Sequence, residues 1–205
     1  KREFFQENAS LSDFGPGGFR PELKLFHSRT VGLSEDREPI GIIAGLKLTG
    51  QMQGMDLGVF NAQTEEFEGT PGSNYSAARV RKKVLPRSNV GFMMTNRQSR
   101  LEDDYNRTLG MDGSFVFFEN LSLESFFALS QTPDLEEEEW AARPLRVSWN
   151  TDFLSTGAEH TIIGRNFNAE MGFVPRTDMK KSAVDFHISP RPGSEAIRQL
   201  DFSAN

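Results

Sequence analysis

The chain has 205 residues and a formal net charge of -6, which gives no support to nucleic-acid binding because nucleic-acid-binding domains usually carry a basic surface. It contains no Cys, so disulfides and thiolate metal sites are excluded. Its hydrophobic content of 37% is low for a soluble globular core, and no apolar run of about 18 residues could form a membrane-spanning helix. The low hydrophobic content therefore favours polar loops or a solvated interior, and the absence of Cys is compatible with an oxidising periplasm or cell surface without fixing a compartment.

The first residues, Lys1 to Phe5, contain no apolar core of a signal peptide, and residues 197–205 resemble a strand that is cut short. We therefore expect the chain to be part of a longer protein. Gly and Pro residues between positions 15 and 21 interrupt any regular element. We predict that residues 1–38 form an irregular lead-in, either inside a barrel or joining it to an upstream domain, and that residues 39–205 form β-barrel hairpins.

Apolar and polar residues alternate with a period of two along most of the chain, as in strands with one apolar and one polar face. The predicted strands cover residues 41–50, 55–62, 76–85, 89–98, 106–118, 121–131, 145–154 and 182–189. Residues 159–174 have a strand-like pattern that is less regular. The fold class that this pattern predicts is all-β, an antiparallel meander of long hairpins.

Short and long connections alternate between these strands. Short, turn-forming links are predicted at residues 51–54, 86–88, 119–120 and 155–157, with another turn at 190–193. Longer polar links cover residues 63–73, 99–104 and 132–143. Outer-membrane barrels have short turns at one end and longer loops at the other, so the alternation favours part of such a barrel.

The polar strand faces carry many ionic residues. Arg79, Arg81, Lys83 and Arg97 would crowd the interior of a small soluble barrel, whereas a wider membrane barrel has room for charges and water. Against this, Tyr and Trp are few, and Lys82 lies on an otherwise apolar face. A soluble antiparallel sheet with one wet face would show the same alternation, so that alternative stays open.

No catalytic constellation is recognisable. The three His residues are far apart in sequence, no Gly-x-Ser-x-Gly elbow occurs, and no phosphate-binding Gly-rich loop is present. Asp112 and Glu124 could face each other as the acid pair of a glycosidase, but we expect such acids to pair with interior arginines. Residues 136–139 are four consecutive Glu, interpreted as a solvated loop tip, with a metal-attracting patch as the alternative. We expect no catalytic residue, metal site or cofactor.

Two sets of residues are the candidate functional positions. The predicted ligand-binding residues form an inward basic column, which would either contact anionic solutes or sugars or balance interior acids: Lys47, Arg79, Arg81, Lys83 and Arg97. The predicted anchors of the lead-in, through salt bridges inside the barrel, are Arg2, Glu7 and Arg29.

Several stretches resemble a bacterial family of unknown function, in which a carbohydrate-binding family-nine-like domain precedes a large C-terminal β region. The matching stretches are residues 1–8, 25–29, 45–50, 58–64, 84–91 and 171–176. The resemblance implies an outer-membrane barrel region whose sugar-binding-like domain lies upstream. Glu3, where the family has Pro, and Ser12-Asp13, where it has a Phe-containing pattern, depart from it.

Three functions remain open from the sequence. The first is an outer-membrane β-barrel that binds or passes small polar solutes, linked to carbohydrate binding or uptake, with the lipid bilayer and a small carbohydrate or anionic solute as partners. The second is a soluble β-rich carbohydrate-binding or glycoside-hydrolase-associated domain, which would be periplasmic or secreted. The third is a structural membrane anchor for an upstream surface domain. The sequence leaves oligomeric state and strand number open.

Overall fold

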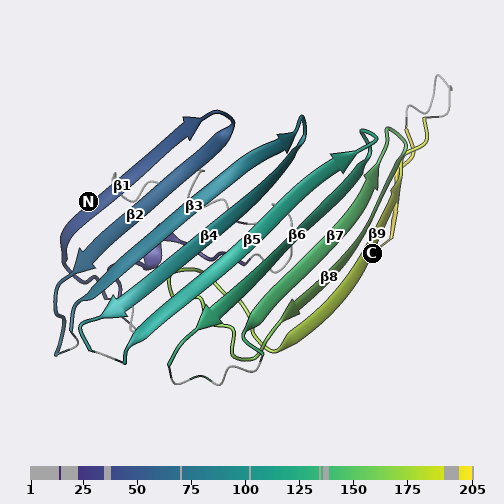
Figure 1. The fold of residues 1–205 in the computed structure, drawn as a ribbon. Helices are drawn as coiled ribbons and strands as arrows, with labels where there is room; N and C mark the ends of the chain where they lie inside the picture. The colour runs from purple at the N-terminus through teal and green to yellow at the C-terminus, as the bar shows by residue number, and fades with distance from the viewer. Residues whose placement is uncertain are drawn as a thin grey trace.

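The computed structural model describes residues 14, 23–34, 38–69, 71–101, 103–133, 135, 139–191 and 199–204. Its main element is one ten-stranded antiparallel sheet in which every strand pairs with its sequence neighbours (Figure 1). The strands are β1 (Ile42–Met52), β2 (Met55–Thr64), β3 (Ser73–Leu85), β4 (Ser88–Ser99), β5 (Tyr105–Phe117), β6 (Leu121–Gln131), β7 (Ala141–Asn150), β8 (Leu154–Ile163), β9 (Met179–Ile188) and β10 (Phe202–Ala204). The predicted all-β meander of hairpins is confirmed.

The sheet is open, because β1 and β10 are its two edges and are not neighbours in the strand order. Closure into a barrel therefore stays a prediction. Tight turns lie together at the upper ends of the strands in Figure 1, and the longer links lie at the lower ends. We call these the turn end and the loop end of the sheet. Among the described residues, no helix is long and apolar enough to span a membrane.

Two-residue and three-residue turns fix the hairpin register. Gln53 and Gly54 join β1 to β2 with φ of 48° and 75°, the left-handed values of a type I′ hairpin turn. Phe118 and Glu119 also have positive φ, 48° and 65°, between β5 and β6. Such turns match the twist of the paired strands, so the β1–β2 and β5–β6 hairpins close at the predicted places.

The prediction was wrong around β7 and β8. Residues 155–157, predicted as a turn, lie inside β8, and the β7–β8 turn lies at residues 151–153. The hydroxyl of Thr151 closes this turn by donating to the carbonyl of Leu154 and accepting from its amide, both at 3.1 Å. Gly157 lies within β8 and faces Asp185 on β9. A Cβ at this position would lie 2.9 Å from a carboxylate oxygen of Asp185, so the absence of a side chain leaves room for that carboxylate.

The predicted irregular strand at residues 159–174 also divides differently. β8 ends at Ile163, and residues 164–178 form a link that returns across the sheet before β9 begins. This link and the described part of the lead-in, residues 23–34, pack on one face of the sheet, which we call the inner face. The lead-in contains the short 3₁₀ helix η1 (Ser28–Thr30).

The buried core lies between the inner face and these two segments. Close packing explains two glycines: a Cβ on Gly110 would lie 2.4 Å from the Phe14 ring, and a Cβ on Gly172 would lie 2.0 Å from the carbonyl oxygen of Lys24. The core consists of Phe14, Leu23, Leu25, Phe26, Val31, Phe60, Ala62, Ala77, Met93, Phe126, Ala128, Ala142, Ile163, Phe167, Ala169 and Met171. The opposite, outer face of the sheet is not covered by any described segment.

Candidate functional site

The innermost residue of the predicted basic column is fully enclosed. Arg79 on β3 donates to both carboxylate oxygens of Asp112 on β5, at 2.5 and 2.8 Å, and the two side chains are only 1% and 6% exposed. Gly91 on the intervening strand makes room, since a Cβ there would lie 2.3 Å from the guanidinium. The ring of Phe14 covers the guanidinium at 5.2 Å. Arg79 is therefore held in a structural ion pair within the core.

The rest of the column lies nearer the turn end. Arg81 pairs with Asp56 on β2 at 3.0 Å, and Gln51 donates to the same carboxylate at 2.8 Å. Lys83 is exposed and Lys47 on β1 is half-buried. The structure thus places acids beside two of the predicted basic residues, which reduces the positive charge that the column would present to an anion.

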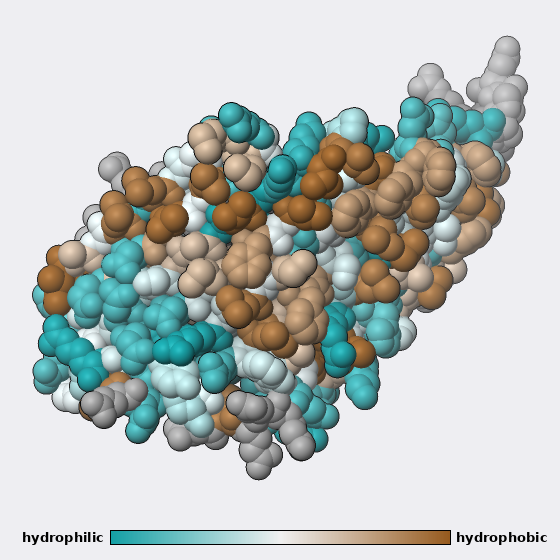
Figure 2. Space-filling model, in the orientation of Figure 1, coloured by the Kyte–Doolittle hydropathy of each residue, from teal (hydrophilic) through white to brown (hydrophobic). Residues whose placement is uncertain are grey.

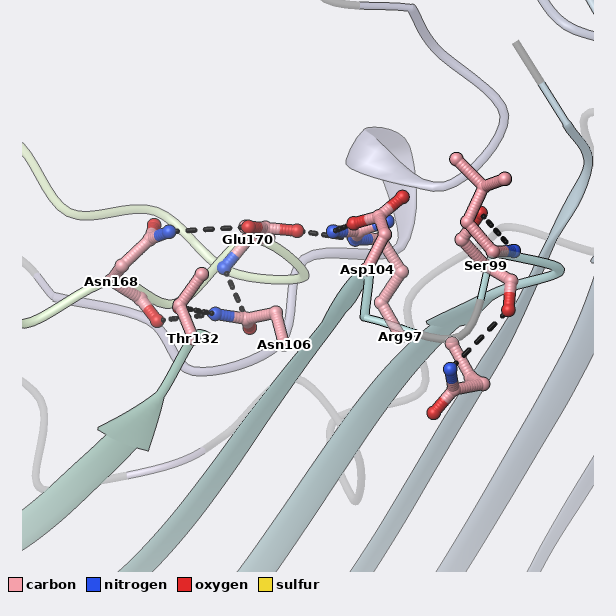
Figure 3. A network of polar contacts seen from close by, with 9 residues as sticks. Arg97, Ser99, Asp104, Asn106, Thr132, Asn168 and Glu170 are labelled. Atoms are coloured by element: carbon pink, nitrogen blue, oxygen red, sulfur yellow. Dashed lines mark hydrogen bonds and ion pairs between the residues drawn. The ribbon is translucent and has the colours of Figure 1, made fainter. Parts of the chain in front are cut away.

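Arg97 lies at the loop end of β4 and belongs to a polar network that joins the sheet to the 164–178 link (Figure 3). Its guanidinium donates to the carboxylates of Asp104, just before β5, and Glu170 in the link. Asn168 donates to the second carboxylate oxygen of Glu170 at 3.2 Å. Four charged or amide side chains from three segments therefore form one continuous network.

Asn106 fixes the position of the link within this network. Its fully buried amide nitrogen donates to the hydroxyl of Thr132 and to the backbone carbonyl of Asn168, both at 2.9 Å. Its amide oxygen accepts from the backbone N–H of Glu170 at 3.3 Å. Both amide hydrogens and the amide oxygen of this side chain thus hold residues against the sheet, which places Glu170 beside Arg97.

The network holds its groups in the ionised state. Burial of Arg97 opposes its charge, but hydrogen bonds to Asp104 and Glu170 outweigh it, and the pKa of the guanidinium is raised. The hydrogen bond from Arg97 lowers the pKa of Asp104 below that of an ordinary aspartate. Asp104 and Arg97 thus stay charged through the neutral pH range.

A cavity of about 540 Å³ opens beside this network, between the lead-in and the loop ends of β2 to β5. It is lined by Thr30, Leu33, Ser34, Ile40, Thr64, Glu65, Pro71, Ser73, Tyr75, Arg97, Asp104 and Glu170. Burial raises the pKa of the Tyr75 hydroxyl, although Arg97 acts against the shift. The cavity therefore combines carboxylates, hydroxyls, an aromatic ring and aliphatic walls.

A second ionic group occupies the inner face near the turn end of β6 to β9. Glu124 on β6 pairs in register with Arg146 on β7, and Arg146 in turn pairs with Glu159 on β8. Arg146 also lies 3.4 Å from the carboxylate of Asp185 on β9. Burial raises the pKa of Glu124, with Arg146 opposing the shift.

The two acids considered as a glycosidase pair have different surroundings. Asp112 is bound by Arg79, and Glu124 lies opposite Ser114 in the β5–β6 register. Among the described residues, no group of three or more His, Cys, Asp or Glu is arranged to hold a metal ion. Of the four-Glu run, residues 136–138 lie outside the described residues.

The lead-in is held by packing and backbone contacts. Lys24 forms an antiparallel bridge with Phe173, and the N–H of His27 donates to the carbonyl of Met171 at 2.7 Å. Of the predicted anchors, Arg29 is exposed and has no ion pair with any residue that the structure describes, while Arg2 and Glu7 lie outside the described residues. The lead-in docks through the buried apolar residues Leu23, Leu25, Phe26 and Val31. These residues are the signal in the sequence that could have predicted docking by apolar packing, whereas the prediction relied on salt bridges.

Comparisons with family models, with curated proteins and with solved structures find no match for this chain. The family resemblance, the carbohydrate link and the cellular location therefore stay predictions.

Proposed function

We propose that this sheet is part of the wall of an outer-membrane-type β-barrel, with its outer face in contact with lipid and its inner face in contact with small polar solutes. The observation that carries the proposal is an apolar band on the outer face that crosses the strands obliquely.

The outer face exposes a continuous set of large apolar side chains (Figure 2). They come from β1 to β7 and from β9, and include Leu46, Leu48, Val59, Val80, Phe92, Met94, Leu109, Met111, Phe127, Leu145, Val147, Trp149, Val184 and Phe186. Such a large exposed apolar surface is unusual for a soluble monomer and indicates contact with lipid or with another protein.

The band shifts along the strands from one side of the sheet to the other. On β3 to β6 its centre is the row Val80, Phe92, Met111 and Phe127, which pair in register. On β7 to β9 the corresponding centre lies closer to the turn end, where Trp149 pairs with Thr156 and Thr156 with Phe186. The band is therefore not parallel to the rows of paired residues.

One row shows both boundaries of the band. It runs in register through Lys82, Val90, Gly113, Ser125, Leu145, His160 and Ser182. Lys82 on β3 lies near the turn-end side of the band, with only Val84 of that strand face beyond it, Val90 and Leu145 lie within the band, and the polar His160 and Ser182 lie at its loop-end side. The two boundaries thus move in the same direction across the sheet.

A membrane explains this obliquity. Strands in a closed barrel tilt by about 35–45° and are staggered relative to their neighbours, so a flat apolar layer cuts across the paired rows. A polar rim on β2 to β5 marks the loop-end boundary, where Asn61 donates to Asn74 at 3.0 Å and to Ser76 at 2.8 Å. Arg107 extends this rim by donating to Asn96 at 3.2 Å.

The inner face supports the solute part of the proposal. Close to the turn end it carries ionic side chains from β2 to β9, among them Arg81, Glu124, Arg146 and Asp185, most of them in pairs. Such a lining suits water and polar solutes rather than a dry core. The lead-in and the 164–178 link fill the loop half of the inner face, which narrows the path that a solute could take.

Because the chain has no Cys, single introduced cysteines can test the lipid contact directly. A polarity-sensitive label is attached in Val90→Cys, Phe92→Cys, His160→Cys or Asn96→Cys variants of the protein in lipid vesicles. We expect brominated lipids to quench labels at positions 90 and 92 but not at 160 and 96. Val90 and His160 are a matched pair, since they share one row of the sheet. Equal quenching at both, or none at position 92, would overturn the proposal.

Conductance across a planar bilayer separates passage of solutes from a purely structural wall. We expect the protein to conduct ions across the bilayer, and we expect Arg146→Glu on the inner face to abolish this conductance. That result would support a path for solutes along the inner face. If the protein conducts no ions but the labels at positions 90 and 92 are quenched, the solute part of the proposal is overturned. Only the lipid contact of the outer face would then stand.

A further inference from the structure

We propose that the cavity at the loop end of β2 to β5 binds a small organic cation, a solute with an ammonium or guanidinium group on a short carbon chain. The inference deepens the proposed function, on which it rests, because it names the class of solute and the place where it is held. No sequence feature singled out this cavity, since its lining comes from the lead-in, three strands (β2, β3 and β4), the loops beside them and the 164–178 link.

The described lining of the cavity carries a net negative charge. It includes the carboxylates of Glu65, Asp104 and Glu170 and, among the residues that the structure describes, one cationic side chain, Arg97, so three negative charges less one positive charge leave two negative charges. The carboxylates also face the solvent-filled space more than the cation does: the side chain of Asp104 is 39% exposed and that of Arg97 is 16% exposed. A solute that enters therefore meets acceptors rather than the guanidinium.

The acceptors are already arranged around a guanidinium. Asp104 and Glu170 bind the Arg97 side chain from two sides, and Asn168 fixes the second oxygen of Glu170. This arrangement prevents the carboxylates from turning away, so little entropy is lost when a second cation approaches them. The hydrogen bond from Arg97 lowers the pKa of Asp104, which favours the charged form of that carboxylate.

Glu65 offers a further carboxylate. It is exposed at the cavity edge and forms no ion pair with any residue that the structure describes. Its carboxylate lies directly over Gly41, where an added Cβ would come within 2.1 Å of the oxygen. Among the three described acids of the cavity, Glu65 is therefore the one that has no ion pair with a described residue.

Apolar groups line the remaining wall. Leu33, Ile40 and Pro71 suit a short carbon chain, and the ring of Tyr75 can contact a cation through its π face. An anionic solute would be repelled by the net charge, and a neutral sugar would gain nothing from it. The combination of carboxylates with aliphatic and aromatic surface therefore favours an alkyl cation.

Isothermal titration calorimetry on the folded protein in detergent, with agmatine as the probe, tests the inference. Agmatine carries a guanidinium and an ammonium on a four-carbon chain. We expect one agmatine to bind per chain, and Glu65→Gln to weaken binding roughly tenfold, the order expected for one lost charged contact. Asp104→Asn should weaken it at least as much. Asp104→Asn can also disturb the network around Arg97. Glu65 has no ion pair with a described residue, so Glu65→Gln tests the loss of a carboxylate without breaking that network.

Glu159→Gln is the matched control, since it removes an acid from the inner face near the turn end and should leave agmatine binding unchanged. Maltose and succinate serve as neutral and anionic probes. Binding of either in place of agmatine, absence of agmatine binding, or equal weakening by Glu159→Gln and Glu65→Gln would overturn the inference. Failure of the lipid contact is distinguishable, because it would alter label quenching in vesicles and leave this titration intact.

Discussion

At the scale of single residues, the inner face contains ion pairs of two very different kinds. Arg79 and Asp112 are enclosed by Phe14 and by the space above Gly91, whereas Arg81 and Asp56 are a quarter to a third exposed. Removing one partner of an enclosed pair leaves an uncompensated charge without water, while an exposed pair gains little from its Coulomb attraction. The ion pairs of Arg79 and Arg81, which are successive residues on one face of β3, should therefore contribute differently to the free energy of unfolding.

We expect Asp112→Asn to destabilise the fold by about 3–5 kcal/mol, because it strands the buried Arg79 charge. Asp56→Asn is the matched control and should cost under about 1 kcal/mol. Urea unfolding followed by circular dichroism measures both free energies of unfolding. Equal losses in the two variants would contradict the enclosed-pair interpretation.

How much of these pairs the sequence could predict depends on the distance between partners. Alternation alone put Arg79, Arg81 and Arg97 on the polar face, and the structure places all three on the inner face. It could not identify Glu170 as a partner of Arg97, because the two are 73 positions apart and meet only when the 164–178 link crosses the sheet. Glu170 also lies in a segment that was predicted as strand.

At the scale of elements, the hairpins were predictable and the long link was not. Turn-forming residues and period-two alternation depend on neighbours in sequence, so β1 to β6 lie close to their predicted bounds. The path of the 164–178 link depends on buried hydrogen bonds to Asn106 on β5 and on close packing of Gly172 against Lys24 and Leu25 of the lead-in. These are long-range contacts, to which no local pattern corresponds.

We expect Asn106→Leu to release the 164–178 link while the sheet stays folded. The change keeps the side-chain size but leaves the Glu170 N–H and the Asn168 carbonyl without their partner, at a cost of about 1–3 kcal/mol for each buried group. Hydrogen exchange read by mass spectrometry should show faster exchange in the link than in β5. Asn96→Leu, on the outer rim, is the control. Unchanged exchange in the link would show that packing alone holds it.

At the scale of the whole molecule, the two faces of one sheet have opposite character. The inner face is covered by the lead-in and the link at its loop end and is ionic at its turn end, while the outer face carries the oblique apolar band (Figure 2). The alternation predicted which residues share a face. The slope of the band could not be predicted, because it requires the register of every strand pair.

From the proposed lipid contact of the outer face we expect Met111→Arg to cost about 2–4 kcal/mol in lipid vesicles, because Met111 lies within the band on β5 and the proposal places it in the bilayer interior. Asn96→Arg on the polar rim should cost about 0–1 kcal/mol. Urea-dependent folding into vesicles, followed by tryptophan fluorescence, measures both. A similar cost for the two variants would argue that the band faces a protein or water.

The docking of the lead-in on the inner face has a consequence for the order in which the chain folds. The hydroxyl of Thr30 in the lead-in donates to the carbonyl of Met171, 141 positions later in the chain. The backbone of Gly172 packs so closely against Lys24 that there is no room for a Cβ. A ribosome therefore releases the lead-in long before its docking surface has been made. Since contacts between such distant positions form slowly, the early segment has to wait, undocked, until eight strands have assembled beside it.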